Sequence, residues 1–179
     1  RIMMARAYMV KPKLIVADEP VSMVDASLRA SILDVMMRLK RENGISFIYI
    51  THDLTTAYQM SNNIVVLYRG AVAEAGDVEH VIKHPQHPYT QELIASIPLP
   101  DPDQRWGQNG AILQPAPDIK RTVAQTRNGC RYADRCPHVM PKCHEAPPPL
   151  YQTAEHHAVA CYLYEQAPIV AAERLSQVL

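Results

Sequence analysis

Two adjacent carboxylates, Asp18 and Glu19, come directly after the apolar run at residues 14–17. A short buried strand that ends in neighbouring acids is how nucleotide-hydrolysing α/β proteins bind Mg²⁺ and orient a water molecule. Many core strands also run into an acidic turn, so the pair alone allows a second interpretation without chemistry. The residues that follow it decide between the two.

Further short motifs follow in a fixed order. Residues 22–25 form Ser-x-x-Asp, and an apolar strand at residues 45–50 runs into Thr-His-Asp at residues 51–53. The order strand-Asp-Glu, Ser-x-x-Asp, strand-Thr-His-Asp resembles the Walker B motif, D-loop and H-loop of ABC transporter ATPases. The resemblance implies ATP and Mg²⁺ as cofactors. It also implies a partial P-loop NTPase fold, an α/β domain built on a parallel sheet with helices.

The same resemblance implies a role for each polar residue. Asp18 would bind Mg²⁺ through a water ligand, and Glu19 would polarise the attacking water. His52 would contact the γ-phosphate, and Asp25 would lie in the loop that crosses to a partner nucleotide domain. The alternatives, an inert acidic strand end and a core or capping histidine, do not account for four elements in the correct order.

The sequence lacks the phosphate-binding part of such a site. None of its six glycines forms G-x-x-x-x-G-K-[ST], and the Leu-Ser-Gly-Gly-Gln signature is missing. Residues 1–7 resemble the helix that follows that signature. We therefore expect the C-terminal half of an ATP-binding subunit, with unpaired strand edges and uncovered apolar surface. By itself this chain should neither hydrolyse ATP nor stay monomeric.

Cys130, Cys136, Cys143 and Cys161 are the second group that could do chemistry. In a proline-rich region with few regular elements, four cysteines suggest a staple. Structural zinc sites mostly use C-x₂₋₄-C pairs, which are absent here, and two disulfides need an oxidising compartment. A [4Fe–4S] cluster needs four thiolates and tolerates wider spacing, so a cluster, zinc, and reduced thiols or disulfides all stay open at this point. Nearby histidines could replace a ligand but are expected at the surface: His138, His144, His156 and His157.

A further resemblance covers the C-terminal portion. Residues 86–93 resemble the His-Pro-Tyr-Thr motif that opens the C-terminal extension of oligopeptide and dipeptide permease ATPases. Residues 129–137 resemble the cysteine segment of that extension, where an iron–sulfur cluster is known in the family. The resemblance therefore implies that the four cysteines bind a [4Fe–4S] cluster, with zinc and reduced thiols or disulfides as alternatives. The histidines and prolines of residues 84–89 are themselves interpreted as a rigid turn.

This second resemblance implies an ATPase subunit of an importer for peptides or related solutes, peripheral to the cytoplasmic face of the membrane. Its partners would be a second ATP-binding subunit, transmembrane permease subunits and, indirectly, an extracytoplasmic solute-binding protein. The alternative function is a non-catalytic module whose four-cysteine segment serves structure or partner binding.

Charge and hydropathy exclude other classes. Lys and Arg together number 18, as do Asp and Glu, so the chain lacks the basic excess of a nucleic-acid-binding protein. We expect no nucleic-acid partner, which disfavours the ABC-type ATPases of DNA repair and translation. No uninterrupted apolar run approaches the roughly 18 residues of a membrane-spanning helix.

Periodicity and breaker residues predict the elements that must hold these residues. Strands are expected at residues 13–17, 45–50, 64–68 and 71–74, with a two-residue hairpin turn at Arg69 and Gly70. Helices are expected at residues 2–10, 27–43, 54–60, 78–83, 91–97 and 163–179, and an extended loop at 98–125. Gly44 stands where the helix at 27–43 would end in a left-handed C-cap. Alternation of strands and helices predicts a parallel sheet that is buried on both faces.

Proline usage predicts the domain boundary. Prolines are sparse before residue 84 and crowded after it. We place the boundary near residues 77–84, with the nucleotide-binding part at 1–80 and the loop-rich, cysteine-containing extension at 81–179.

Overall fold

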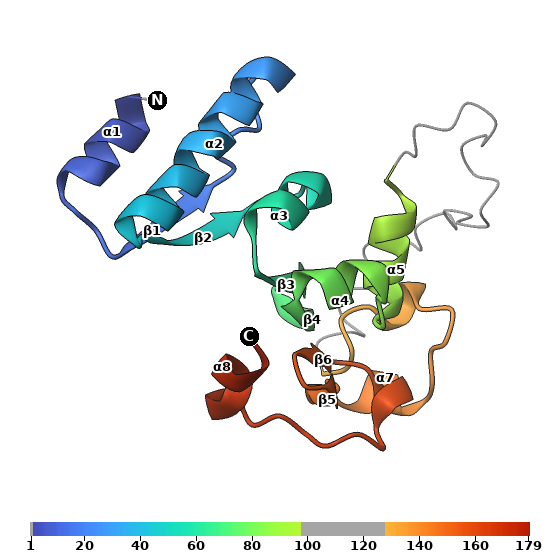
Figure 1. Cartoon of the computed structure of the whole chain (residues 1–179). Coiled ribbons are helices and arrows are strands. Elements are labelled where there is room, and N and C mark those ends of the chain that lie inside the picture. The colour runs from blue at the N-terminus through green and yellow to red at the C-terminus, as the bar shows by residue number, and fades with distance from the viewer. Residues whose placement is uncertain (1, 98–127) are drawn as a thin grey trace. The chain divides into compact units, whose positions relative to one another are not determined.

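The computed structural model describes residues 2–97 and 128–179, so the loop expected at 98–125 lies outside the described residues. Contacts divide the chain into two compact units, Arg1–Ser61 and Asn62–Leu179 (Figure 1). This division lies N-terminal to the boundary predicted near residues 77–84. The reason is that the hairpin predicted for the first part pairs with strands from the end of the chain.

The first unit is α/β. A parallel pair of strands runs in register from Leu14 opposite Ser46 to Asp18 opposite Ile50. The connecting helix begins after Asp25 and ends at Gly44, whose φ of +64° is the left-handed cap that the sequence predicted. The elements in order are α1 (Ile2–Met9), β1 (Leu14–Asp18), α2 (Ala26–Asn43), β2 (Ser46–Ile50) and α3 (Leu54–Met60).

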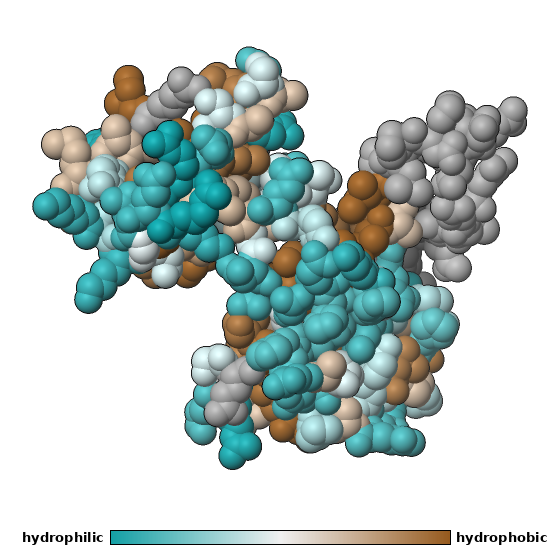
Figure 2. Space-filling model, in the orientation of Figure 1, coloured by the Kyte–Doolittle hydropathy of each residue, from teal (hydrophilic) through white to brown (hydrophobic). Residues whose placement is uncertain are grey.

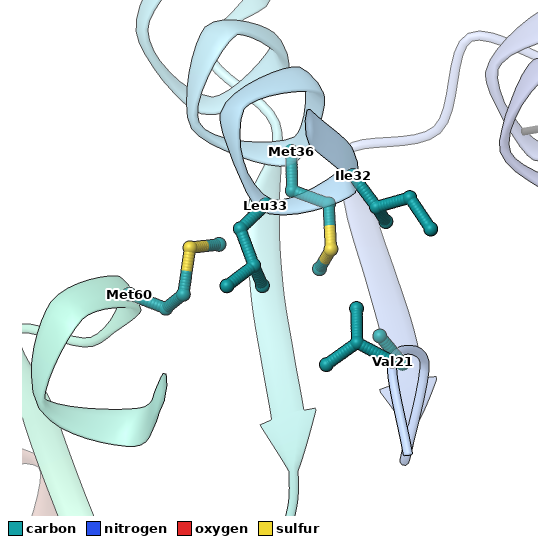
Figure 3. Close-up of a cluster of buried hydrophobic side chains, with 6 residues drawn as sticks. Val21, Ile32, Leu33, Met36 and Met60 are labelled. Atoms are coloured by element: carbon teal, nitrogen blue, oxygen red, sulfur yellow. The ribbon is translucent and has the colours of Figure 1, made fainter. Parts of the chain in front are cut away.

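The core of this unit lies between α2 and one face of the sheet. Figure 3 shows Ile32 and Met36 extending from α2 toward Val21, and Met60 of α3 reaching toward Leu33. Met36 is completely buried. These five side chains, together with Ala17 of β1, form one apolar cluster that fixes the strand ends against the helix.

The opposite face of the parallel sheet is open in the described residues. Leu14 and Val16 are 49% and 59% exposed, and Ile48 and Ile50 are similarly exposed. The prediction of strands buried on both faces is therefore wrong for this structure, because α2 covers only one face. The expectation of uncovered apolar surface is confirmed, and exposed apolar residues are visible in brown in Figure 2.

The second unit is built on an antiparallel sheet with strand order β3-β4-β6-β5. The third predicted strand, residues 64–68, belongs to this sheet and not to the parallel one, which corrects the sequence analysis. The chain turns back here in a hairpin and makes no helical crossover. Arg69 and Gly70 have φ of +48° and +77°, the paired left-handed conformation of a two-residue hairpin turn. The turn itself is confirmed.

The remaining elements of this unit are short. The strands are β3 (Asn63–Tyr68), β4 (Ala71–Asp77), β5 (Tyr151–Ala154) and β6 (His157–Val159). The α-helices are α4 (Val78–Lys83), α5 (Pro88–Ala95), α7 (Lys142–Glu145) and α8 (Leu175–Val178). The 3₁₀ turns are η1 (Ala133–Arg135), η2 (Tyr162–Tyr164) and η3 (Ala172–Arg174).

The C-terminal helix predicted at 163–179 is wrong. Proline at 168 lacks an N–H for a helix interior, and Val170 donates its N–H to the carbonyl of Leu150. Tyr151 also forms an isolated bridge with Ile169. The segment therefore runs extended beside β5 before the short α8. Across the part of the chain that the structure describes, no helix has the length and apolar character to cross a membrane.

Candidate functional site

Asp18 and Glu19 leave the end of β1 in a sharp turn. The Glu19 N–H donates to the carbonyl of Ile50 at 2.9 Å, which joins the ends of β1 and β2. Glu19 itself has φ of +42°, in the left-handed region that a residue with a side chain rarely adopts. The turn explains how consecutive acids leave the strand together, and Asp18 and Glu19 are both exposed.

Glu19 meets His52, which follows β2. Glu19 Oε1 and His52 Nδ1 lie 2.8 Å apart, while the side chains are 44% and 77% exposed. The hydrogen bond from His52 is the main cause that lowers the pKa of Glu19 below its ordinary value. His52 is neither a core nor a capping residue, so the alternative interpretation of this histidine is wrong. An exposed carboxylate that is held anionic can orient a water molecule, and the imidazole beside it can contact a phosphate.

Sequence reasoning missed two residues that fix this arrangement. Asp53 caps α3 by accepting from the N–H groups of Thr55 at 2.9 Å and Thr56 at 3.4 Å. Arg29 lies 3.6 Å from Asp53 and donates to the carbonyl of Val24 at 3.4 Å. An Asp before a predicted helix indicates an N-cap, whereas nothing in the position of Arg29 in the sequence predicts its contact with Asp53.

The Ser-x-x-Asp loop lies beside the same turn. Ser22 donates from its N–H and its Oγ to the carbonyl of Glu19, at 3.3 Å and 3.1 Å. Asp25 occupies the N-cap position of α2, but its side chain makes no cap hydrogen bond there. The structure thus brings Glu19 and His52 into contact, and it leaves the Asp25 carboxylate exposed.

All four cysteines line one cavity in the second unit, together with His87 and His138. None is in a disulfide. Burial raises the pKa of the Cys130, Cys136 and Cys161 thiols, the last to about 11. Within residues 2–97 and 128–179, no three His, Cys, Asp or Glu side chains are placed so that they could hold a metal ion. The cysteines share a cavity, and the metal centre stays a prediction.

A close backbone contact positions two of the cysteines. The Cys130 N–H donates to the carbonyl of Cys143 at 2.7 Å. A Cβ on Gly129 would lie 2.4 Å from that carbonyl oxygen, so only glycine fits at this position. This requirement gives a physical reason for glycine at the start of the cysteine segment at residues 129–137.

A buried carboxylate organises the turn before α5. Glu74 of β4 is completely buried and accepts from the N–H groups of Gln86 and His87, each at 2.9 Å. His157 Nε2 lies 2.6 Å from Glu74, and its side chain is 3% exposed. The surface position predicted for His157 is therefore wrong, while His138, His144 and His156 are exposed as expected. Residues 84–89 are also more than a turn, because Pro88 begins α5.

Comparisons with known proteins found similar sequences among transport ATP-binding proteins. The family described as "Oligopeptide/dipeptide transporter, C-terminal region" matches residues 73–143. YkfD of Bacillus subtilis, named as an oligopeptide transport ATP-binding protein, is 37% identical over 170 residues, 93% of this chain and 50% of that protein. The region of these relatives that the chain matches is their C-terminal half.

Another relative matches the chain with similar identity and coverage. The oligopeptide transport ATP-binding protein OppF of Escherichia coli is 37% identical over 164 residues, 90% of this chain and 47% of that protein. The chain thus spans about half the length of the curated relatives that it matches. A solved ATP-binding cassette of an ABC transporter in its ADP conformation is 28% identical and covers 49% of this chain and 36% of that chain, with a TM-score of 0.43.

Proposed function

We propose that this chain forms the hydrolytic part of an ATP-hydrolysing subunit of an ABC importer for peptides or related small solutes. The contact between Glu19 and His52 is the observation that carries the proposal. Two polar side chains from the ends of neighbouring parallel strands meet at 2.8 Å and stay exposed. A site for a bound nucleotide needs such groups at one edge of the sheet. The names of the transport ATP-binding relatives support the same assignment.

The residues present suit the Mg²⁺ and γ-phosphate end of an ATP site. Exposed carboxylates at a strand end are the oxygen donors that Mg²⁺ takes, usually with several waters retained, so Asp18 would hold the ion through water. Bound there, Mg²⁺ would neutralise charge on the β- and γ-phosphate oxygens. Glu19 would orient the attacking water and accept its proton, and His52 would contact the γ-phosphate.

The proposed partners follow from the incomplete site. Asp25, exposed at the start of α2, would contact a second ATP-binding subunit. Because no G-x-x-x-x-G-K-[ST] occurs in the sequence, we propose that the chain alone turns over no ATP. The complete assembly would include transmembrane permease subunits that receive solute from an extracytoplasmic binding protein, with this subunit on the cytoplasmic face.

A chimera tests the hydrolytic assignment. The N-terminal half of E. coli OppF would be joined ahead of Ile2, and ATP turnover of the purified product measured. Glu19→Gln should lower the turnover number by about 10²-fold or more, because a positioned general base contributes on that order. Asp34→Asn removes an exposed carboxylate of α2 and should leave turnover unchanged. Equal turnover in the parent and Glu19→Gln chimeras would refute the assignment.

We further propose that the four cysteines hold a [4Fe–4S] cluster, with zinc as the alternative. The support is that all four cysteines line one cavity and none is in a disulfide, while binding would require their side chains to move, because no three of them are placed to hold a metal ion in this structure. A bound cluster would supply metal–sulfur bonds that tie η1, α7 and the start of η2 together. Anaerobic reconstitution followed by iron, sulfide and zinc analysis tests this. Iron and sulfide should be bound by the parent chain and lost in Cys143→Ser, whereas zinc alone would favour the alternative.

The second candidate function is a non-catalytic module that binds a partner. It is favoured by the absence of a phosphate-binding loop from the sequence and by the exposed apolar face of β1 and β2. The chimera distinguishes the two functions. ATP turnover that depends on Glu19 supports the hydrolytic subunit, and a parent chimera that folds without turnover supports the module.

A further inference from the structure

Arg29, in the first turn of α2, contacts both the loop at residues 22–25 and the segment at residues 51–53. One end of its guanidinium, Nη2, donates to the carbonyl of Val24 at 3.4 Å. The other end, Nη1, lies 3.6 Å from Asp53 Oδ2. The planar fork of an arginine holds two groups at a fixed separation, which the single ammonium of a lysine does not do.

The contact with Asp53 leads directly to the proposed site. Asp53 follows His52 in the chain, and its second oxygen, Oδ1, accepts from the N–H groups of Thr55 and Thr56. One carboxylate therefore joins the start of α3 to Arg29. Any change in its position acts on the backbone that carries His52.

The loop at residues 22–25 reaches the same site by a second route. Ser22 donates from its N–H and its Oγ to the carbonyl of Glu19, and the Glu19 carboxylate meets His52 at 2.8 Å. The contacts close a ring that runs through Glu19, His52, Asp53, Arg29, Val24 and Ser22. A displacement at one member of such a network changes the contacts of its neighbours.

The ring of contacts adds little to stability. The side chains of Arg29 and Asp53 are 36% and 33% exposed, and ion pairs with this exposure contribute little. Arg29 Nε is buried without a hydrogen-bond partner in the described part of the chain, which costs free energy. Met23, in the middle of the loop, is 97% exposed and accessible to a partner. Stability alone therefore does not account for an arginine here, whereas a link between the two segments does.

We propose that Arg29 is a positioning residue that couples the loop at residues 22–25 to His52, so that contact of a second ATP-binding subunit with this loop also sets the orientation of His52 toward the γ-phosphate. The inference rests on the proposed function and adds the route by which the partner acts on the hydrolytic site. The coupling is reciprocal, so a nucleotide that contacts His52 favours the loop conformation that the partner binds.

The link is tested first in the whole chain without nucleotide. Arg29→Gln removes the guanidinium. Asp53→Asn breaks the same contact from the other side, because an amide nitrogen replaces Oδ2 while the amide oxygen keeps the cap of α3. Carbon-detected NMR follows the pKa of the Glu19 carboxyl, and the ring signals of His52 are recorded in the same samples.

The two variants differ in the sign of the charge that they remove. Through space alone, loss of the arginine would raise the pKa of Glu19 and loss of the aspartate would lower it. Release of His52 raises this pKa in both variants, because the hydrogen bond from His52 is the main cause that lowers it. Measurement in about 0.5 M NaCl suppresses the through-space effect between exposed groups.

We expect the pKa of Glu19 to rise and the His52 ring signals to shift in both variants. The amide signals of Met23 and Val24 should also shift in Asp53→Asn, which lies across Arg29 from the loop. A pKa that falls in Asp53→Asn, or His52 ring signals at the parent positions in either variant, would overturn the link. Arg38→Gln is the control, because Arg38 is an exposed arginine of the same helix that pairs with Glu42.

The consequence for hydrolysis is tested in the chimera that carries the N-terminal half of E. coli OppF. Arg29→Gln and Asp53→Asn should each lower kcat about 10-fold. KM for ATP should stay at the parent value, because Arg29 orients a group that acts in the transition state. Both variants break one contact, so the double variant should have the kcat of the single variants. Losses that multiply in the double variant would overturn the coupling, and Arg38→Gln should keep the parent kcat.

The failure of this inference is distinguishable from failure of the proposed function. A folded parent chimera without turnover that depends on Glu19 refutes the proposed function, while the NMR measurements still decide whether Arg29 links the loop to His52. A parent chimera with such turnover, and Arg29→Gln at the parent kcat, overturns only the role of Arg29.

Discussion

The two units each contain a contact between a glutamate and a histidine, and the surroundings of the two contacts differ. Glu19 and His52 meet at 2.8 Å with side chains 44% and 77% exposed. Glu74 and His157 meet at 2.6 Å with side chains 0% and 3% exposed. In water the first contact can open at little cost, whereas the second has no solvent to replace a lost partner. The exposed pair suits a site that must accept a ligand, and the buried pair suits a structural centre.

The hydrogen-bond partners reinforce this difference. Glu19 meets one imidazole through its side chain, while Glu74 receives two backbone N–H groups as well as His157. The two backbone donors come from the turn that positions His87 at the cysteine cavity. A change at Glu74 should therefore disturb the whole unit, and a change at Glu19 should disturb mainly the chemistry.

The largest expected effect is at Glu74. Glu74→Gln replaces a carboxylate that accepts three donors with an amide that has one acceptor oxygen, so at least one buried donor is left unpaired. Breaking a buried pair in this way costs about 3–5 kcal/mol. Urea denaturation of the whole chain, followed by tyrosine fluorescence, should show that loss. Glu155→Gln changes an exposed glutamate of the same unit and should cost less than about 0.5 kcal/mol. Equal midpoints for the two variants would contradict a structural centre at Glu74.

A smaller effect is expected at Gly129. In Gly129→Ala the new Cβ would lie 2.4 Å from the Cys143 carbonyl oxygen, so the backbone must move and the Cys130–Cys143 hydrogen bond must lengthen. Such overpacking costs about 1–3 kcal/mol. The reaction of the buried Cys143 thiol with a disulfide reagent should become faster. Asn128→Ala alters the exposed neighbour and should leave thiol reactivity at the parent rate.

The next largest effect is expected at Asp53, which caps α3 beside His52 in the first unit. Asp53→Ala removes the acceptor for Thr55 and Thr56 at the start of α3, which should cost about 1 kcal/mol. Amide hydrogen exchange at these two positions should accelerate about fivefold. Asp53→Asn keeps a cap oxygen but removes the charge that faces Arg29, so its exchange rates should stay close to the parent's. Matching rates in the alanine variant would show that the cap contributes nothing.

The sequence predicted the exposed contact far better than the buried one, for a physical reason. Glu19 and His52 follow strands whose parallel pairing brings their carboxyl ends to one edge, so the motif order predicts that both residues belong to one site, although not that they touch. Glu74 and His157 are 83 positions apart, and neither residue belongs to a motif that predicts a contact with the other. Their contact depends on β4 pairing with β6, a long-range choice that local patterns do not encode.

The incorrect elements have a similar origin. The residues Arg69 and Gly70 predict the hairpin turn, but alternation with helices, which favours crossovers, predicts that its first strand joins the parallel sheet. The helix at 163–179 followed from local composition, and the tertiary pairing of Val170 with Leu150 overrode it. Short-range signals predicted the turn and the cap at Gly44, while contacts between distant segments decided the rest.

The smallest expected effect concerns the exposed contact itself. The hydrogen bond from His52 lowers the pKa of the Glu19 carboxyl below its ordinary value of 4.5. In His52→Ala the pKa of Glu19 should return toward that value, which carbon-detected NMR of the glutamate carboxyl can follow. Because the pKa is lower in the folded chain, the contact stabilises the fold above pH 4.5 and loses its effect as the pH falls through the folded value. The variant's stability should therefore differ from the parent's slightly at pH 7, and this difference should vanish in acid. A Glu19 pKa that does not move in His52→Ala would mean that the turn at Glu19, with its positive φ, holds the carboxylate without help from the histidine.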